Sequence, residues 1–209
     1  MIFFMSFAVL HGQVAGRGAI GLRGGFQIGI HEPHNHFKTW VGLDNLKSES
    51  KNNPNLVLYG AFGFSNYIGI QTELNFMFSQ GVRGAKGGRS VEMFYTSLDM
   101  PLLLRINFLP SQTRFGILGG PLFTFPLGKI NTKYEGFLNH DEKGEIDAPN
   151  FGFAAGLFFG HPIDFGFFML DFRYLMDFGQ SFEKHSGNFD FGVMQRRGIV
   201  IGLGVEFTI

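Results

Sequence analysis

Cysteine is absent from the 209-residue sequence, which excludes disulfides, thiolate metal sites and lipidated cysteines. Charge is scarce as well: charged residues make up 16%, against roughly 25% in soluble domains. Lys+Arg and Asp+Glu number 17 each, so the basic excess that nucleic-acid-binding proteins need is missing. Beyond residue 16 the sequence also lacks any run of about 18 uncharged apolar residues, so no membrane-spanning helix is expected.

Glycine and phenylalanine are the residues in excess. There are 31 Gly, about twice the ordinary share, and 28 Phe against one Trp and five Tyr. Such an aromatic content excludes a disordered chain. Apolar residues reach 44%, yet they are dispersed among glycine and polar residues instead of being gathered into long helices.

The first ten residues are apolar except for Ser6 and have the length of the hydrophobic part of a signal peptide. Small residues follow them, so we expect residues 1–16 to be a signal peptide and residues 17–209 a single domain. No Lys or Arg precedes the apolar run, which leaves open a true start upstream of the printed one. A buried N-terminal strand is the alternative interpretation of this segment.

The rest of the sequence alternates between apolar and small or polar residues with a period of two, which predicts β-strands. The clearest case is Ile68 to Ser79, where apolar residues and Thr72 alternate with Gly69, Gln71, Glu73, Asn75, Met77 and Ser79. In all, the alternation predicts eight strands, near residues 19–30, 56–64, 68–79, 94–107, 115–127, 151–160, 165–176 and 198–209.

The connections between these segments differ in length in a regular way. Short connections, near residues 65–67, 108–114 and 161–164, alternate with long ones, near residues 31–55, 80–93, 128–150 and 177–193. Consecutive antiparallel strands with tight turns at one end and long loops at the other are typical of a transmembrane barrel. In such a barrel both termini lie on the periplasmic side, together with the short turns.

The distribution of charge supports a membrane barrel. No Asp, Glu, Lys or Arg falls on the outward face of the eight segments, where a charge at the membrane midplane would cost about 2 to 4 kcal/mol. Eight strands enclose a space that side chains just fill, so charges on the other face must pair with one another inside. We therefore predict a lumen charge network that consists of Arg23, Glu73, Asp99, Arg105, Asp171, Arg173 and Glu206.

These features predict an all-β fold, an eight-stranded antiparallel up-and-down transmembrane β-barrel. Without helical spans, a closed barrel is the structure that satisfies every backbone N–H and C=O group in the bilayer. A soluble, lipocalin-like barrel with an apolar interior is the alternative. It would bury the Phe-rich face and turn Arg23, Glu73 and Arg105 outward.

Several short motifs resemble those of the small outer-membrane barrels of the PorT-like type and of the outer membrane protein X class. They run from the third predicted strand to the C-terminus and comprise residues 70–74, 98–105, 118–121, 170–174 and 201–207. The resemblance implies an integral protein of the bacterial outer membrane, surrounded by its lipid and inserted by the barrel-assembly machinery. It also implies a second possible function, that of a helper of protein secretion in the envelope.

Signals for chemistry are sparse. His31, His34 and His36 lie together with Glu32 at the start of the first long connection and are candidate metal ligands, although a polar loop is the simpler interpretation. The stretch Gly81–Arg89 lacks the Lys-Ser/Thr ending of a phosphate loop, so we interpret it as a mobile, solvated loop with three positive charges.

Candidate catalytic residues in an envelope enzyme acting on lipid would be His140 with Asp141, or His185 with Ser181 and Ser186. Proximity in sequence does not establish a triad, so we predict no catalytic residue, no enzymatic activity and no cofactor.

The predicted function is therefore that of a non-enzymatic outer-membrane barrel. Its long surface loops would serve structural, adhesive or host-interaction roles, through an extracellular ligand bound by these loops. Two alternatives are small-molecule transport across the outer membrane and assistance to protein secretion in the envelope. The charged inner face argues against transport of hydrophobic molecules.

Overall fold

A computed structural model describes residues 16–33, 51–86, 89–109, 113–135, 141–144, 149–178 and 194–209. They form nine antiparallel strands: β1 (Gly18–Pro33), β2 (Lys51–Gly63), β3 (Ile68–Lys86), β4 (Arg89–Asn107), β5 (Arg114–Glu135), β6 (Asp141–Gly144), β7 (Asn150–Ile163), β8 (Gly166–Asp177) and β9 (Met194–Thr208). Among the residues described, none forms a helix long and apolar enough to span a membrane.

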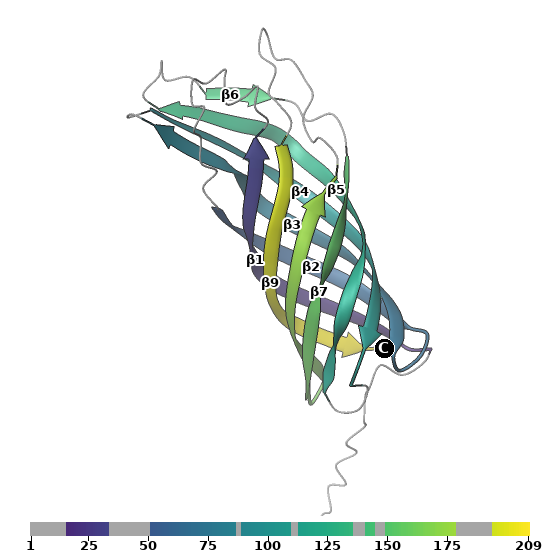
Figure 1. Cartoon of the computed structure of the whole chain (residues 1–209). Helices are drawn as coiled ribbons and strands as arrows, with labels where there is room; N and C mark the ends of the chain where they lie inside the picture. The colour runs from purple at the N-terminus through teal and green to yellow at the C-terminus, as the bar shows by residue number, and fades with distance from the viewer. Residues whose placement is uncertain are drawn as a thin grey trace, which may run out of the picture.

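Eight of these strands close into a barrel, and the short β6 is an addition to one end. Each barrel strand pairs with its neighbours along the chain, and the pairing of β1 with β9 closes the sheet. β6 pairs only with the distal part of β5, where Lys133 lies opposite Asp141. In Figure 1, β6 lies at one end of the barrel and the C-terminus at the other. The predicted eight-stranded antiparallel up-and-down barrel is confirmed.

The barrel is apolar outside and polar inside, the reverse of a soluble protein. Exposed large side chains follow the outer face of each of the eight barrel strands, such as Leu22 on β1, Leu58 on β2 and Phe172 on β8. The inner face buries polar and charged side chains, including Arg23, Gln71 and Asp99. This matches the alternation predicted from the sequence. Only a hydrocarbon environment makes such an apolar exterior favourable, because contiguous exposed apolar surface is rare on soluble monomers.

One end of the barrel is closed by tight turns. In the turn between β2 and β3, the Ser65 hydroxyl accepts hydrogen bonds from the backbone N–H groups of Tyr67 and Ile68, at 3.2 and 3.0 Å. Both ends of the described part of the chain lie near this turn: the N–H of Gly16 donates to the Gly63 carbonyl at 2.8 Å, and the N–H of Ile209 donates to the Gly18 carbonyl at 2.9 Å. We call this the turn end of the barrel and the opposite end the loop end.

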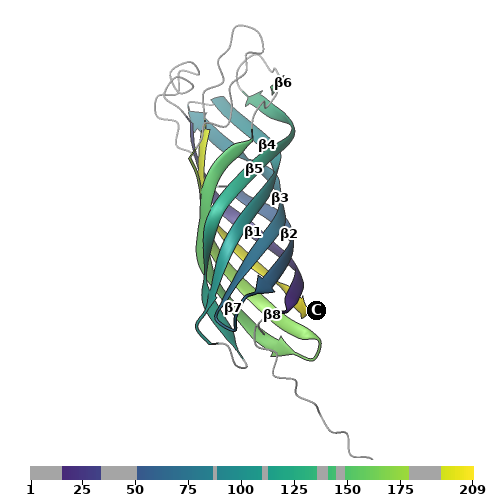
Figure 2. The same ribbon diagram turned by 90° about the vertical axis from the view of Figure 1, so that its right-hand side faces the viewer.

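The strands extend further toward the loop end than the sequence pattern predicted. β3 continues to Lys86 and β4 begins at Arg89, so the predicted loop over residues 80–93 and the mobile loop over Gly81–Arg89 are wrong. Within the 128–150 connection β5 runs on to Glu135, and β6 forms. The barrel is elongated as a result (Figure 2).

A β-bulge explains why the alternation in the sequence did not predict that β3 continues beyond Ser79. The β3–β4 register shifts between Met77 and Gln80, and Ser79 has a positive φ of 53°. Ser79, predicted on the inner face, is therefore exposed, and Gln80 is fully buried in its place. An extra residue reverses the faces beyond it, so strict alternation ends there although the strand does not.

Glycines let neighbouring strands of this barrel approach closely. A Cβ on Gly156 of β7 would lie 2.0 Å from the carbonyl oxygen of Phe172 and 2.8 Å from Arg173 Cα, both on the backbone of β8. On the adjacent strand β5, a Cβ on Gly119 would meet nothing closer than 3.5 Å. The first position tolerates no side chain, whereas the second offers ordinary contact distances.

We expect Gly156→Ala to destabilise the barrel by about 1–3 kcal/mol, since the backbones of β7 and β8 must move apart. The measurement is the urea-unfolding midpoint of the protein folded in detergent micelles. The matched control, Gly119→Ala, should change this midpoint little. Equal effects of the two substitutions would show that the close approach of β7 to β8 does not matter for stability.

The ion-pair network of the barrel interior

Among the residues that the structure describes, ten charged side chains fill the lumen, and they are arranged in three layers along the barrel axis. The turn-end layer consists of Arg105, Arg114, Glu206 and the polar Tyr59; the central layer of Arg23, Glu73, Asp171 and Arg173; and the loop-end layer of Asp99, Asp177 and Arg196. All five cations are arginine, whose planar group binds carboxylates through two parallel hydrogen bonds and is less strongly hydrated than a lysine ammonium.

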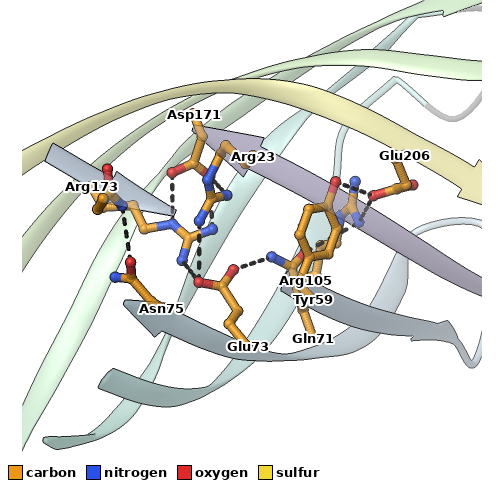
Figure 3. Close-up of polar contacts among 10 residues, drawn as sticks. Arg23, Tyr59, Gln71, Glu73, Asn75, Arg105, Asp171, Arg173 and Glu206 are labelled. Atoms are coloured by element: carbon orange, nitrogen blue, oxygen red, sulfur yellow. Dashed lines mark hydrogen bonds and ion pairs between the residues drawn. The ribbon is translucent and has the colours of Figure 1, made fainter. Parts of the chain in front are cut away.

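The central layer joins three strands by four ion pairs (Figure 3). Arg23 on β1 lies 3.1 Å from Glu73 on β3 and 3.1 Å from Asp171 on β8. Arg173 approaches the same two carboxylates, through Nη1 to Glu73 at 2.6 Å and through Nε to Asp171 at 2.7 Å. Two cations therefore share two anions, and the layer is neutral.

The turn-end layer is built around Glu206, which is fully buried. Arg105 donates from Nη1 to Glu206 at 2.8 Å, Arg114 donates to the other carboxylate oxygen, and the Tyr59 hydroxyl donates at 3.2 Å. The guanidinium groups of Arg105 and Arg114 lie over the rings of Phe158 and Phe167, at 4.4 and 3.6 Å from the ring centroids. Stacking on a ring covers the face of a guanidinium and leaves its edge for hydrogen bonds.

The loop-end layer is built around Arg196. Its guanidinium donates to Asp99 at 2.8 Å, to Asp177 at 3.1 Å and to the Thr124 hydroxyl at 2.8 Å. It also donates to Gln80 at 3.0 Å, the residue that the bulge turns inward. Arg196 thereby ties β9 to β3, β4, β5 and β8.

Interior glycines make room for these long side chains. A Cβ on Gly21 would lie 2.0 Å from the Tyr59 ring, and a Cβ on Gly202 would lie 2.5 Å from Arg23 Cδ. Buried ion pairs of this kind are costly to desolvate, and removing one partner leaves an uncompensated charge. The buried charges are paired only when these strands lie in one particular register, so the network favours that register.

The structure places all seven residues of the predicted lumen network inside the barrel. Arg23, Glu73, Asp171 and Arg173 form the central layer, Arg105 and Glu206 meet at the turn end, and Asp99 contacts Arg196. Arg114 and Asp177 were not predicted as members of the network because they fall in the expected connections, and Arg196 was not because it precedes the last predicted strand. Their signal was present in the alternation: Asp177 continues the inward series 171, 173, 175 of β8, and Arg196 precedes the inward Gly198 of β9.

The candidate metal ligands remain a prediction. His34 and His36 lie outside the described residues, and of His31 only the backbone is described. Within the part of the chain that the structure describes, no group of three or more His, Asp or Glu residues could hold a metal ion. The candidate catalytic residues His140, Ser181, His185 and Ser186, and the predicted signal peptide apart from Gly16, also fall outside the described residues.

A closed antiparallel barrel with an apolar exterior and an ion-paired interior is a transmembrane β-barrel. Among solved structures it resembles the outer membrane protein OprG from Pseudomonas aeruginosa, with a TM-score of 0.56 and 12% identity over 95% of this chain and 99% of that one. Ail, the attachment invasion locus protein of Yersinia pestis, aligns with a TM-score of 0.47 and 16% identity over 93% of this chain and 100% of that one. No protein-family model and no curated protein matches the sequence.

Proposed function

We propose that this protein is a non-enzymatic barrel of the bacterial outer membrane whose body anchors long surface loops for structural, adhesive or host-interaction roles. Outer-membrane lipid would surround its apolar face, and the barrel-assembly machinery would insert it. Its termini would be periplasmic, because Gly18 and Ile209 lie at the turn end. The fold shared with OprG is consistent with this location.

The filled interior is the observation that carries this proposal. Three layers of interlocked charged side chains cross the lumen, and apolar groups such as Leu103, Phe158 and Phe167 are packed among them. Arg105, Glu73 and Asp99 are at most 2% exposed although all belong to the lumen. A body built in this way serves as a rigid support rather than a wide water-filled pore. Interaction with the outside then falls to the connections at the loop end.

We expect the folded protein to show no stepwise ion conductance in planar bilayers at moderate voltage. The sample must first pass two checks: different gel migration of boiled and unboiled protein, and a β-type circular dichroism spectrum. A heat-modifiable sample with reproducible conductance steps would contradict the closed body and favour small-molecule transport.

The loop role is tested separately, in cells that display the protein. Replacement of residues 34–50 and 179–193 by Gly-Ser linkers should abolish adhesion to matrix-coated surfaces without loss of heat modifiability. Gly119→Ala, with native loops, is the matched control. Unchanged adhesion after loop replacement, or a protein-secretion defect on deletion of the gene instead, would contradict the adhesive role and favour a secretion helper.

A further inference from the structure

A small hollow lies inside the barrel at its turn end, next to the turn-end layer. Its lining includes Arg105, Arg114, Glu206 and Thr208, with Arg17 at the rim. The space exists because Ala19 on β1 and Ala61 and Gly63 on β2 are small residues on the side that faces the two arginines. It has room for about one water-sized occupant.

Positive charge exceeds negative charge around this hollow. The buried part of its lining includes the guanidinium groups of Arg105 and Arg114 and one carboxylate, that of Glu206. Arg17 adds a further positive charge at the exposed rim. Arginine cannot lose its proton in a protein, so this lining favours a negatively charged occupant.

Two residues that line the hollow, Arg105 and Thr208, also carry buried hydrogen-bond donors without a partner. Arg105 uses Nη1 for Glu206 and Gln71, and its face is covered by Phe158, but Nε and Nη2 are buried without a hydrogen bond. The buried hydroxyl of Thr208 has none either. Arg105 is 1% exposed, and burying such donors without an acceptor is unfavourable.

We propose that the hollow binds a small inorganic anion of halide size, such as chloride, between the Nε/Nη2 edge of Arg105 and the Thr208 hydroxyl. The anion accepts the unpaired hydrogen bonds and balances the excess positive charge in one step. The hollow admits only a single-atom anion, because it is too small for an organic anion. The positive charge of Arg17 at the rim attracts anions from the aqueous side toward the hollow. This binding site is independent of the role of the loops.

The test compares sodium chloride and bromide with sodium gluconate at equal ionic strength, so that general screening is the same. The urea-unfolding midpoint of the micelle-folded, heat-modifiable protein should rise with either halide and then level off, because a ligand bound only to the folded state stabilises it saturably. Gluconate should have no such effect. Equal responses to halide and gluconate would overturn the proposal and leave water in the hollow.

Three variants locate the effect. Thr208→Val removes one donor to the anion and should weaken halide affinity about tenfold. Ala61→Val fills the hollow without altering either arginine and should abolish the halide response. Thr72→Val, the same chemical change on the exposed outer face of β3, should leave the response intact. An unchanged response in Ala61→Val would overturn the assignment to this hollow.

Bromide also allows a direct observation, since it scatters anomalously. Crystals grown in sodium bromide should show an anomalous peak within hydrogen-bond distance of Arg105 and Thr208. A peak elsewhere only, or no peak in crystals grown at halide concentrations that stabilise the protein, would contradict the proposed site.

Discussion

Replacement of Glu73 by Gln should destabilise the folded barrel by about 3–5 kcal/mol, the range for breaking a buried ion pair from one side. Glu73 is 2% exposed and pairs with Arg23 at 3.1 Å and Arg173 at 2.6 Å. Its loss leaves two buried arginines to share Asp171 alone. The measurement is the free energy of unfolding in urea, followed by the gel shift between folded and unfolded protein.

The control for this prediction restores the balance of charge. Glu73→Gln combined with Arg173→Met leaves Arg23 paired with Asp171 at 3.1 Å, so neither charge is stranded. The double variant should therefore be more stable than the sum of the single effects predicts, because removal of both partners costs less than removal of one. If the changes in free energy of unfolding of the two single variants simply add in the double variant, Glu73 and Arg173 are not coupled in the folded state.

The second large effect is expected on the outer face. Phe172 lies midway along β8, is 44% exposed and is paired in register with Leu157 and Ile201 on the neighbouring strands. Phe172→Arg should destabilise the barrel folded in lipid vesicles by about 2–4 kcal/mol, the cost of an arginine near the membrane midplane. Unfolding in urea, measured in vesicles of fixed composition, gives this difference.

Phe165→Arg provides the matched control, since it makes the same change in the turn between β7 and β8. Phe165 is 62% exposed and lies at the turn end, where the cost of a charge falls to about 0–1 kcal/mol. The two variants differ in depth and not in chemistry. A stable Phe172→Arg variant that is soluble in plain buffer would show that the Phe-rich face does not contact lipid.

These two predictions test separate parts of the barrel, its inner ion-pair network and its outer apolar face. The outer face stabilises the barrel only in a hydrocarbon environment, whereas the inner network acts in any medium because the strands themselves exclude water from it. A detergent that replaces the bilayer should therefore reduce the penalty of Phe172→Arg more than that of Glu73→Gln.

Much of this architecture could be predicted from the sequence because the face of each strand residue is a local property. In β8, Phe172 and Tyr174 point outward and Asp171 and Arg173 inward, as the period of two requires. Combined with the need to satisfy every backbone group in a bilayer, this alternation predicts a closed barrel. The lengths of the connections then predict which end carries the turns.

Two features could not be predicted from neighbouring residues in the sequence. They are the ends of the strands and the three network residues that the sequence pattern did not indicate. The bulge at Ser79 reverses the alternation, and β3 continues beyond it by pairing with β4, which no pattern within β3 reveals. Arg196 lies beyond the end of the predicted strand, and its partners Asp99 and Asp177 belong to other strands. Its burial follows from the extended pairing of β9 with β1.

The sequence by itself determined the fold class, the number of barrel strands and the face on which each side chain of their regular segments lies, since alternation acts over two residues. Only the tertiary structure decided which charges meet. Glu73 and Arg173 are 100 residues apart in the chain and come within 2.6 Å because closure of the barrel brings β3 and β8 to face each other across the lumen. Partners across a lumen depend on register and curvature, which are properties of the whole sheet.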